Sequence, residues 1–125
     1  MATSVLRNMI PGLVAGADLS THQYKVVKFA STAGQVIRVT ASTDVALGIL
    51  QNDPTSGQPA LIAGPGDIAI GIAGASNLAQ GNLLGYNTSA QLITAAATDK
   101  IAQALEASTA VGDYIKVLVL GLSAS

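Results

Sequence analysis

The protein has 125 residues, of which half are hydrophobic, 3% are aromatic and 10% are charged, and its formal net charge is −1. This length suits one domain, and the near-neutral charge gives no electrostatic footprint for nucleic acid or anionic lipid. Cysteine is absent, which excludes disulfides and thiolate metal sites. Because few charged residues are available to cover a surface, we expect an obligate assembly that hides apolar surface between subunits.

The first 17 residues are predicted to form an extended N-terminal arm, and residues 18–125 to form one β-domain. Pro11 and Gly12 disfavour a regular helix or strand in the arm. The arm nevertheless carries apolar side chains that could be buried on a partner: Val5, Leu6, Met9, Ile10, Leu13 and Val14. It could order on a partner surface, for example by adding a strand to an open sheet edge, or pack over its own barrel.

From Tyr24 onward the chain is predicted to be a series of short strands separated by turns. Residues 24–29 carry apolar side chains on both faces, which is typical of a two-sided or edge strand. Pro65 and Gly66, at the second and third positions of a Gly-Pro-Gly-Asp turn, predict type II geometry. The other expected strands cover residues 35–40, 67–73, 78–86 and 114–120.

The strand at residues 67–73 has two unlike faces. Ile68, Ile70 and Ile72 lie on one face, and Ala69, Gly71 and Ala73 lie on the other. We expect the isoleucine face to fill the core. The small-residue face allows close backbone approach, either in a tight contact between subunits or as a layer inside a narrow barrel. The three small residues are therefore candidate oligomer contacts.

An internal repeat organises the β-domain. Residues 101–105 alone fit a helix or a strand, but Gly48 in the earlier copy favours a strand for both. A shift of about 56 residues aligns the copies. The aligned segments are 35–41 with 91–97, 45–50 with 101–106 and, after a one-residue slip, Gly57 with Gly112 and 60–62 with 115–117. The repeat predicts an all-β fold, a small β-barrel or β-sandwich, with the copies as two halves of one closed sheet.

No constellation of residues indicates catalysis. His22 is the only histidine, and we expect it to be an exposed loop residue. Most aspartates lie beside Gly, Pro or Thr, where Asp commonly stabilises turns. Neither paired carboxylates, nor metal-ligand spacing, nor a phosphate-binding loop stands out. The sequence therefore predicts no catalytic residue, no metal and no cofactor.

Residues 101–118 are mostly small and apolar side chains at strand spacing, and similar segments precede them at residues 78–84 and 89–95. This pattern resembles the C-terminal half of the capsid cement, or head decoration, proteins of tailed bacteriophages. Residues 45–50 followed by Gly57 are similar to the matching earlier part of that family, so the resemblance runs roughly from Asp18 to the end.

The resemblance implies a structural protein that is not an enzyme. Such proteins bind the outside of an expanded icosahedral capsid, often as trimers, and clamp neighbouring capsomers against internal DNA pressure. The expected partners are the major capsid protein and further copies of this chain, and the expected location is the outer surface of the virion. In a protein of this kind, we expect the N-terminal arm to be the part that binds the capsid.

Two other functions remain open at this stage. One is a head-fibre base or minor virion β-barrel protein, which would be present in low copy number. The other is a small soluble β-domain with a binding or enzymatic role, in which His22, Asp53 or Asp67 would line a pocket.

Overall fold

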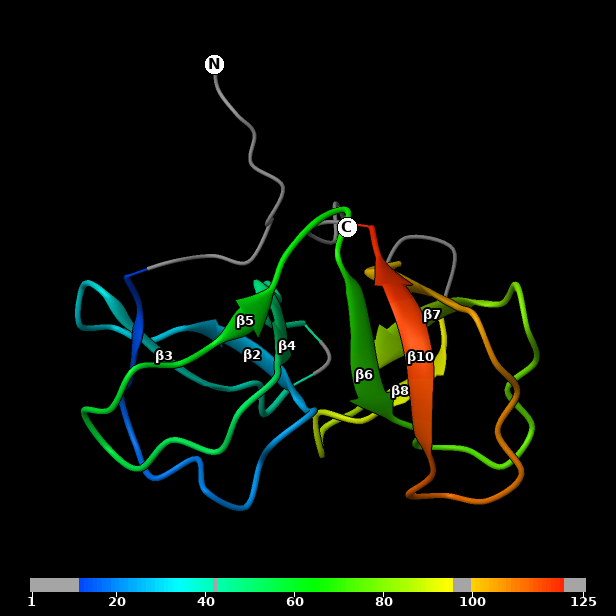
Figure 1. The fold of residues 1–125 in the computed structure, drawn as a ribbon, viewed down its shortest axis with the longest axis horizontal. Coiled ribbons are helices and arrows are strands. Elements are labelled where there is room, and N and C mark those ends of the chain that lie inside the picture. The colour runs from blue at the N-terminus through cyan, green and yellow to red at the C-terminus, as the bar shows by residue number, and fades with distance from the viewer. Residues whose placement is uncertain (1–11, 42, 96–99, 121–125) are drawn as a thin grey trace.

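The protein is described by a computed structural model over residues 12–41, 43–95 and 100–120, and in these ranges it contains strands and no helix. The strands form two five-stranded sheets, which lie side by side (Figure 1). The first sheet has the order β1-β3-β2-β4-β5 and the second β6-β10-β9-β7-β8. The strands are β1 (Val14–Ala15), β2 (Val26–Phe29), β3 (Gln35–Arg38), β4 (Gly48–Leu50), β5 (Ile62–Ala63), β6 (Ile68–Ile72), β7 (Leu83–Tyr86), β8 (Leu92–Thr94), β9 (Ala102–Ala104) and β10 (Tyr114–Val119). The prediction of an all-β fold is confirmed.

Each sheet closes into a small barrel through its first strand. In the first sheet, β1 pairs with β3 in parallel and also bridges Pro59, just before β5. In the second sheet, β6 pairs with β10, and Ala73 at its end forms a parallel bridge to Leu92 of β8. We call these units the first barrel and the second barrel.

The two barrels share one topology and one strand register. Val27 of β2 lies opposite Gly48 of β4, just as Leu84 of β7 lies opposite Ala102 of β9. The same correspondence holds around both rings, with β1 to β5 matching β6 to β10 in order. Further matching pairs are Ala15–Val36 with Ala73–Leu92, Phe29–Val36 with Tyr86–Leu92, Ile49–Ala63 with Gln103–Leu118, and Val14–Pro59 with Ile72–Tyr114. The internal repeat is therefore confirmed at the level of the backbone.

Two details of the predicted repeat are wrong. The copies are not halves of one closed sheet, because each copy builds its own ring of strands. Within the β4 segment, Gly48 matches Ala102, whereas the alignment of residues 45–50 with 101–106 places it beside Ala104. A shift of two residues leaves every side chain on the same face of a strand, so the alternation of apolar residues does not detect it.

The turns repeat as well as the strands. Gly57 and Gly112 have φ angles of 84° and 96°, and their N–H groups donate to the carbonyls of Ala15 and Ala73, each at 2.8 Å. These positive φ angles favour glycine. At two other matched pairs of positions only one copy has glycine, yet φ is positive in both: Gly34 with Ala90, and Tyr24 with Gly81.

The predicted type II turn connects the two barrels. Gly66 has a φ angle of 88°, and the Asp67 N–H donates to the Gly64 carbonyl at 3.0 Å. Asp67 also accepts a hydrogen bond from the Gly64 N–H through its carboxylate, at 2.9 Å. The turn prediction is confirmed, and the Asp67 side chain holds the turn together.

The buried side chains form two clusters. The first fills the first barrel and includes Val27, Leu50 and Ile62. The second fills the second barrel and also contains outward-facing residues of the first barrel, among them Val26 and Ile49. Adjacent Val26 and Val27 are both fully buried because one faces the second barrel and the other faces its own barrel interior. This explains why β2 has two apolar faces, and its place between β3 and β4 excludes an edge position.

Candidate functional site

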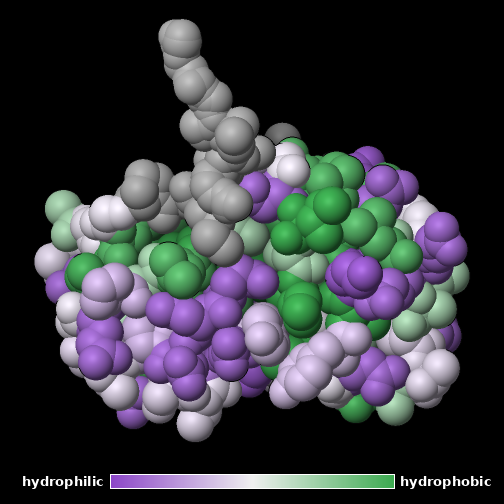
Figure 2. Space-filling view, viewed as in Figure 1, coloured by the Kyte–Doolittle hydropathy of each residue, from purple (hydrophilic) through white to green (hydrophobic). Residues whose placement is uncertain are grey.

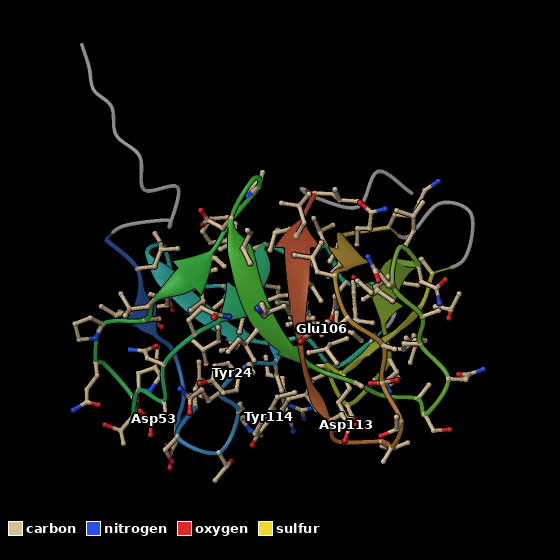
Figure 3. All side chains as sticks on the ribbon, turned by 45° about the vertical axis from the view of Figure 1, so that its right-hand side comes forward. Tyr24, Asp53, Glu106, Asp113 and Tyr114 are labelled. Atoms are coloured by element: carbon tan, nitrogen blue, oxygen red, sulfur yellow. The ribbon has the colours of Figure 1, made fainter. Side chains whose placement is uncertain are left out.

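The structure does not bring together the titratable residues considered for a catalytic pocket. In the described part of the chain, no hydrogen bond or ion pair joins any two of the side chains of His22, Asp53 and Asp67. Asp53 is exposed in a loop of the first barrel, whereas Asp67 is used in the turn between the barrels. Figure 3 shows Asp53 well separated from Asp113 on the second barrel. Across the described residues, no group of three or more His, Cys, Asp or Glu is placed to hold a metal ion.

Two hydrogen-bonded carboxylates, those of Asp113 and Asp44, stabilise turns. Asp113 accepts hydrogen bonds from the backbone N–H groups of Thr109 at 2.8 Å and Ala110 at 3.0 Å, and these bonds lower the pKa of its carboxyl group. Asp44 accepts the Thr40 N–H at 2.9 Å and pairs with Lys28 at 2.9 Å, and these two contacts lower its pKa. Both carboxylates are thus ionised acceptors in loops, as the sequence predicts for turn aspartates.

His22 differs from the prediction of an exposed loop residue. Its side chain is half-buried, and its Nδ1 atom is buried without a hydrogen-bond partner in the described part of the structure. Burial lowers the pKa of the imidazole, and the positive charges of Lys25 and Arg38 lower it further. The imidazole is therefore neutral at pH 7.

Of the two placements predicted for the small-residue face of β6, the structure shows the layer inside a narrow barrel, so the isoleucine face does not fill the core. Ala69, Gly71 and Ala73 face the interior of the second barrel and are buried. A Cβ atom on Gly71 would lie 2.5 Å from the Leu92 Cδ1 atom, so no larger side chain fits without repacking. The three residues form the small-residue layer of a narrow barrel, and in this structure they present no surface for contact with a second subunit.

The isoleucines of β6 instead lie on the outside of the second barrel. Ile68 is 67% exposed and Ile70 37% exposed, although both were expected in the core. Alternation shows that a strand has two faces but does not show which one faces inward. The barrel is so narrow that small side chains fit its axis, and the large ones are left outside.

These isoleucines belong to an exposed apolar face that crosses four strands. The register places Ile68 beside Leu118 of β10, Leu118 beside Gln103 of β9, and Gln103 beside Leu83 of β7. Figure 2 shows hydrophobic surface over β6 and β10. We define the apolar outer face as Ile68, Ile70, Leu83, Leu105, Tyr114, Leu118 and Leu120.

The last residues of the predicted arm, residues 1–17, are part of the first barrel. Leu13 and Val14 belong to the first barrel, because the Val14 N–H donates to the Gly34 carbonyl at 3.1 Å and the Ala60 N–H to the Leu13 carbonyl at 2.9 Å. The boundary predicted between residues 17 and 18 therefore falls inside the barrel. The other apolar residues proposed for the arm, Val5, Leu6, Met9 and Ile10, lie outside the described residues.

No protein-family model matches the chain, and no curated protein matches it. The candidate site is therefore judged by its geometry, which is an exposed sheet face carrying Ile68, Leu83 and Tyr114. The face is mainly aliphatic and aromatic, with Lys116 and Gln103 among its apolar side chains. A broad face of this kind suits the surface of another protein better than a small polar ligand, which binds in concave pockets.

Proposed function

We propose that this protein is a structural virion protein that binds the outer surface of an expanded icosahedral phage capsid and cements neighbouring capsomers. The observation that carries the proposal is the apolar outer face. Most of its side chains stand on hydrogen-bonded strands, so little backbone entropy is lost when a partner covers them. The resemblance of residues 101–118 to head decoration proteins supports the same role.

Binding to the assembled capsid stabilises it by mass action. A protein that binds the assembled shell and not its free subunits shifts the equilibrium toward the shell. A copy that reaches two capsomers has to be released from both before they separate. Several copies joined in one oligomer add effective concentration to individually modest contacts. The partner is the major capsid protein, and the location is the outer surface of the capsid.

The N-terminal arm is the second proposed contact. Because Leu13 and Val14 are part of the first barrel, the capsid-binding residues proposed for the arm are Val5, Leu6, Met9 and Ile10. A deletion that tests this role should stop at residue 11, since removing β1 would open the first barrel.

Co-sedimentation with expanded capsids that lack decoration tests the proposal. The purified protein should bind saturably, near a whole number of copies per capsomer junction. Deletion of residues 2–11 and the double variant Ile68→Asp, Tyr114→Asp should each weaken binding. Val45→Asp, at a 63% exposed site outside the apolar outer face, should bind like the wild type.

Absence of binding by the folded wild-type protein would overturn the proposal. Circular dichroism of each variant separates loss of binding from loss of folding. Saturation at only a few copies per particle would instead indicate a head-fibre base or minor virion protein.

A further inference from the structure

The two barrels of the chain are joined by a defined contact. On the first barrel, a row of fully buried residues across β2, β4 and β5 faces the second barrel: Val26, Ile49 and Ala63. On the second barrel, the Ala90 carbonyl accepts the Val26 N–H at 3.0 Å, and the Tyr86 hydroxyl donates to the Asp44 carbonyl. The contact is thus between unlike surfaces, a row on one barrel and a covering surface on the other.

The same row exists on the second barrel, where the described residues leave it partly exposed. Because the registers of the two barrels match, Val26, Ile49 and Ala63 correspond to Leu83, Gln103 and Leu118. Leu83 is 39% exposed, and Gln103 and Leu118 are half-buried. The side of the second barrel that matches the joined side of the first barrel is therefore open. We call these three residues the open row.

The counterpart of the covering surface lies on the first barrel, where the described residues leave it exposed. Tyr86 and Ala90 correspond to Phe29 and Gly34, and Tyr114, which also contacts the first barrel, corresponds to Pro59. All three first-barrel residues are exposed, and Phe29, the only phenylalanine of the chain, is 57% exposed. We call Phe29, Gly34 and Pro59 the free cover.

We propose that a second copy of this chain docks its free cover on the open row, repeating between molecules the contact that joins the two barrels within one. The occupant is identified by the internal repeat, because the described part of each molecule carries one unfilled row and one unused cover. The contact is heterologous, so successive copies form a closed ring or an open filament. This contact covers Leu83 and Leu118 of the apolar outer face, and the neighbouring side chains of Ile68 and Ile70 on β6 are the part of that face left for another partner.

The contact between copies is weaker than the contact inside the chain. Within the chain, the Gln51 side-chain amide donates to the Ile70 carbonyl at 3.0 Å and accepts the Ile70 N–H at 3.2 Å. The Tyr24 and Tyr114 rings also meet edge to face across the barrels, with centroids 5.3 Å apart. Leu105 and Gly81 stand at the positions of Gln51 and Tyr24, so neither contact forms between copies. We expect association that is reversible and dependent on concentration.

Sedimentation velocity of the full chain, without capsids, tests the proposal independently of the capsid-binding function. The weight-average mass of the wild type should rise with concentration beyond that of a dimer. Phe29→Glu and Leu83→Glu should each remain monomeric, since each places a charge in one of the two surfaces. Val111→Glu, which changes a 62% exposed residue outside both surfaces, should associate like the wild type.

Mixing the two blocked variants separates a heterologous contact from a symmetric one. Phe29→Glu keeps its open row and Leu83→Glu keeps its free cover, so an equimolar mixture should form dimers and no larger species. A wild type that stays monomeric at concentrations on the order of 1 mM would overturn the proposal. So would a mixture of folded variants that remains monomeric, or association that survives Phe29→Glu.

Discussion

Replacement of Gly48 by alanine should strongly destabilise the first barrel. A Cβ atom at Gly48 would lie 2.2 Å from the Ala63 carbonyl oxygen and 2.8 Å from the Ile62 Cγ2 atom. The first of these contacts has to lengthen to about 3.4 Å, and because a backbone oxygen cannot rotate away, β5 has to shift relative to β4. The shift strains the pairing of Ile49 with Ala63 and the hydrogen bond from the Gln51 N–H to the Leu61 carbonyl.

We expect Gly48→Ala to lower the free energy of unfolding by about 2–3 kcal/mol, the usual cost of overpacking a tight site. For a chain of this size the melting temperature should fall by about 8–12 °C. Urea denaturation followed by circular dichroism measures the first quantity, and a thermal scan measures the second.

Gly71→Ala is the matched control. Its added Cβ atom meets the end of the Leu92 side chain at 2.5 Å, and the next nearest atoms are 3.5 Å and 3.8 Å away. Because a leucine side chain can change rotamer, the loss should stay below about 1 kcal/mol. Equal losses for the two variants, or a change within about 0.5 kcal/mol for Gly48→Ala, would refute the reasoning.

Three further predictions follow from individual residues. Gly57→Ala and Gly112→Ala should each lower the free energy of unfolding by about 1–2 kcal/mol, because φ is positive at both positions while no atom within 4 Å obstructs a Cβ. Losses that differ by more than about 1 kcal/mol between the two variants would contradict the equivalence of the two turns. Ser108→Ala should cost about 1–3 kcal/mol in urea denaturation, because the Ser108 hydroxyl accepts the Leu78 N–H and donates to a backbone carbonyl in a buried site; a loss below about 0.5 kcal/mol would contradict this. Since the pKa of His22 is lowered in the folded protein, the unfolded chain binds more protons than the folded chain as the pH falls from about 7 to 5, so the free energy of unfolding should decrease in that window. His22→Gln should remove this decrease, and an unchanged slope of stability against pH in the variant would contradict the prediction.

The sequence predicts secondary structure well where turns have specific chemistry. The Gly-Pro-Gly-Asp turn at residues 64–67 is predicted with its geometry, because only glycine readily takes the positive φ angle found at Gly66. The strand at residues 114–120 is predicted from its β-branched and apolar residues and is found as β10. β1 is missed because its two residues pair with a strand some twenty positions away and carry no periodic signal of their own.

The orientation of the strands could not be read from the sequence. Alternation in residues 67–73 separates isoleucines from small residues correctly, yet it says nothing of the radius of the barrel that one face must fill. The narrow interior accepts Ala69, Gly71 and Ala73, so Ile68 and Ile70 stand outside. For this reason the sequence assigns the residues of this strand to its two faces correctly but does not show that the isoleucine face is the exposed one.

The sequence by itself determined an all-β chain of low charge with an internal repeat, because turn glycines and alternating apolar residues are local signals. Only the tertiary structure decided that each copy closes its own barrel and that the first barrel is covered by the second. Which surface of a barrel is covered depends on which strands of the two barrels meet. Val26 is buried and its counterpart Leu83 is exposed, although the backbone registers around them are identical. The difference arises because Val26 packs against the second barrel, whereas Leu83 lies on the outside of the described structure.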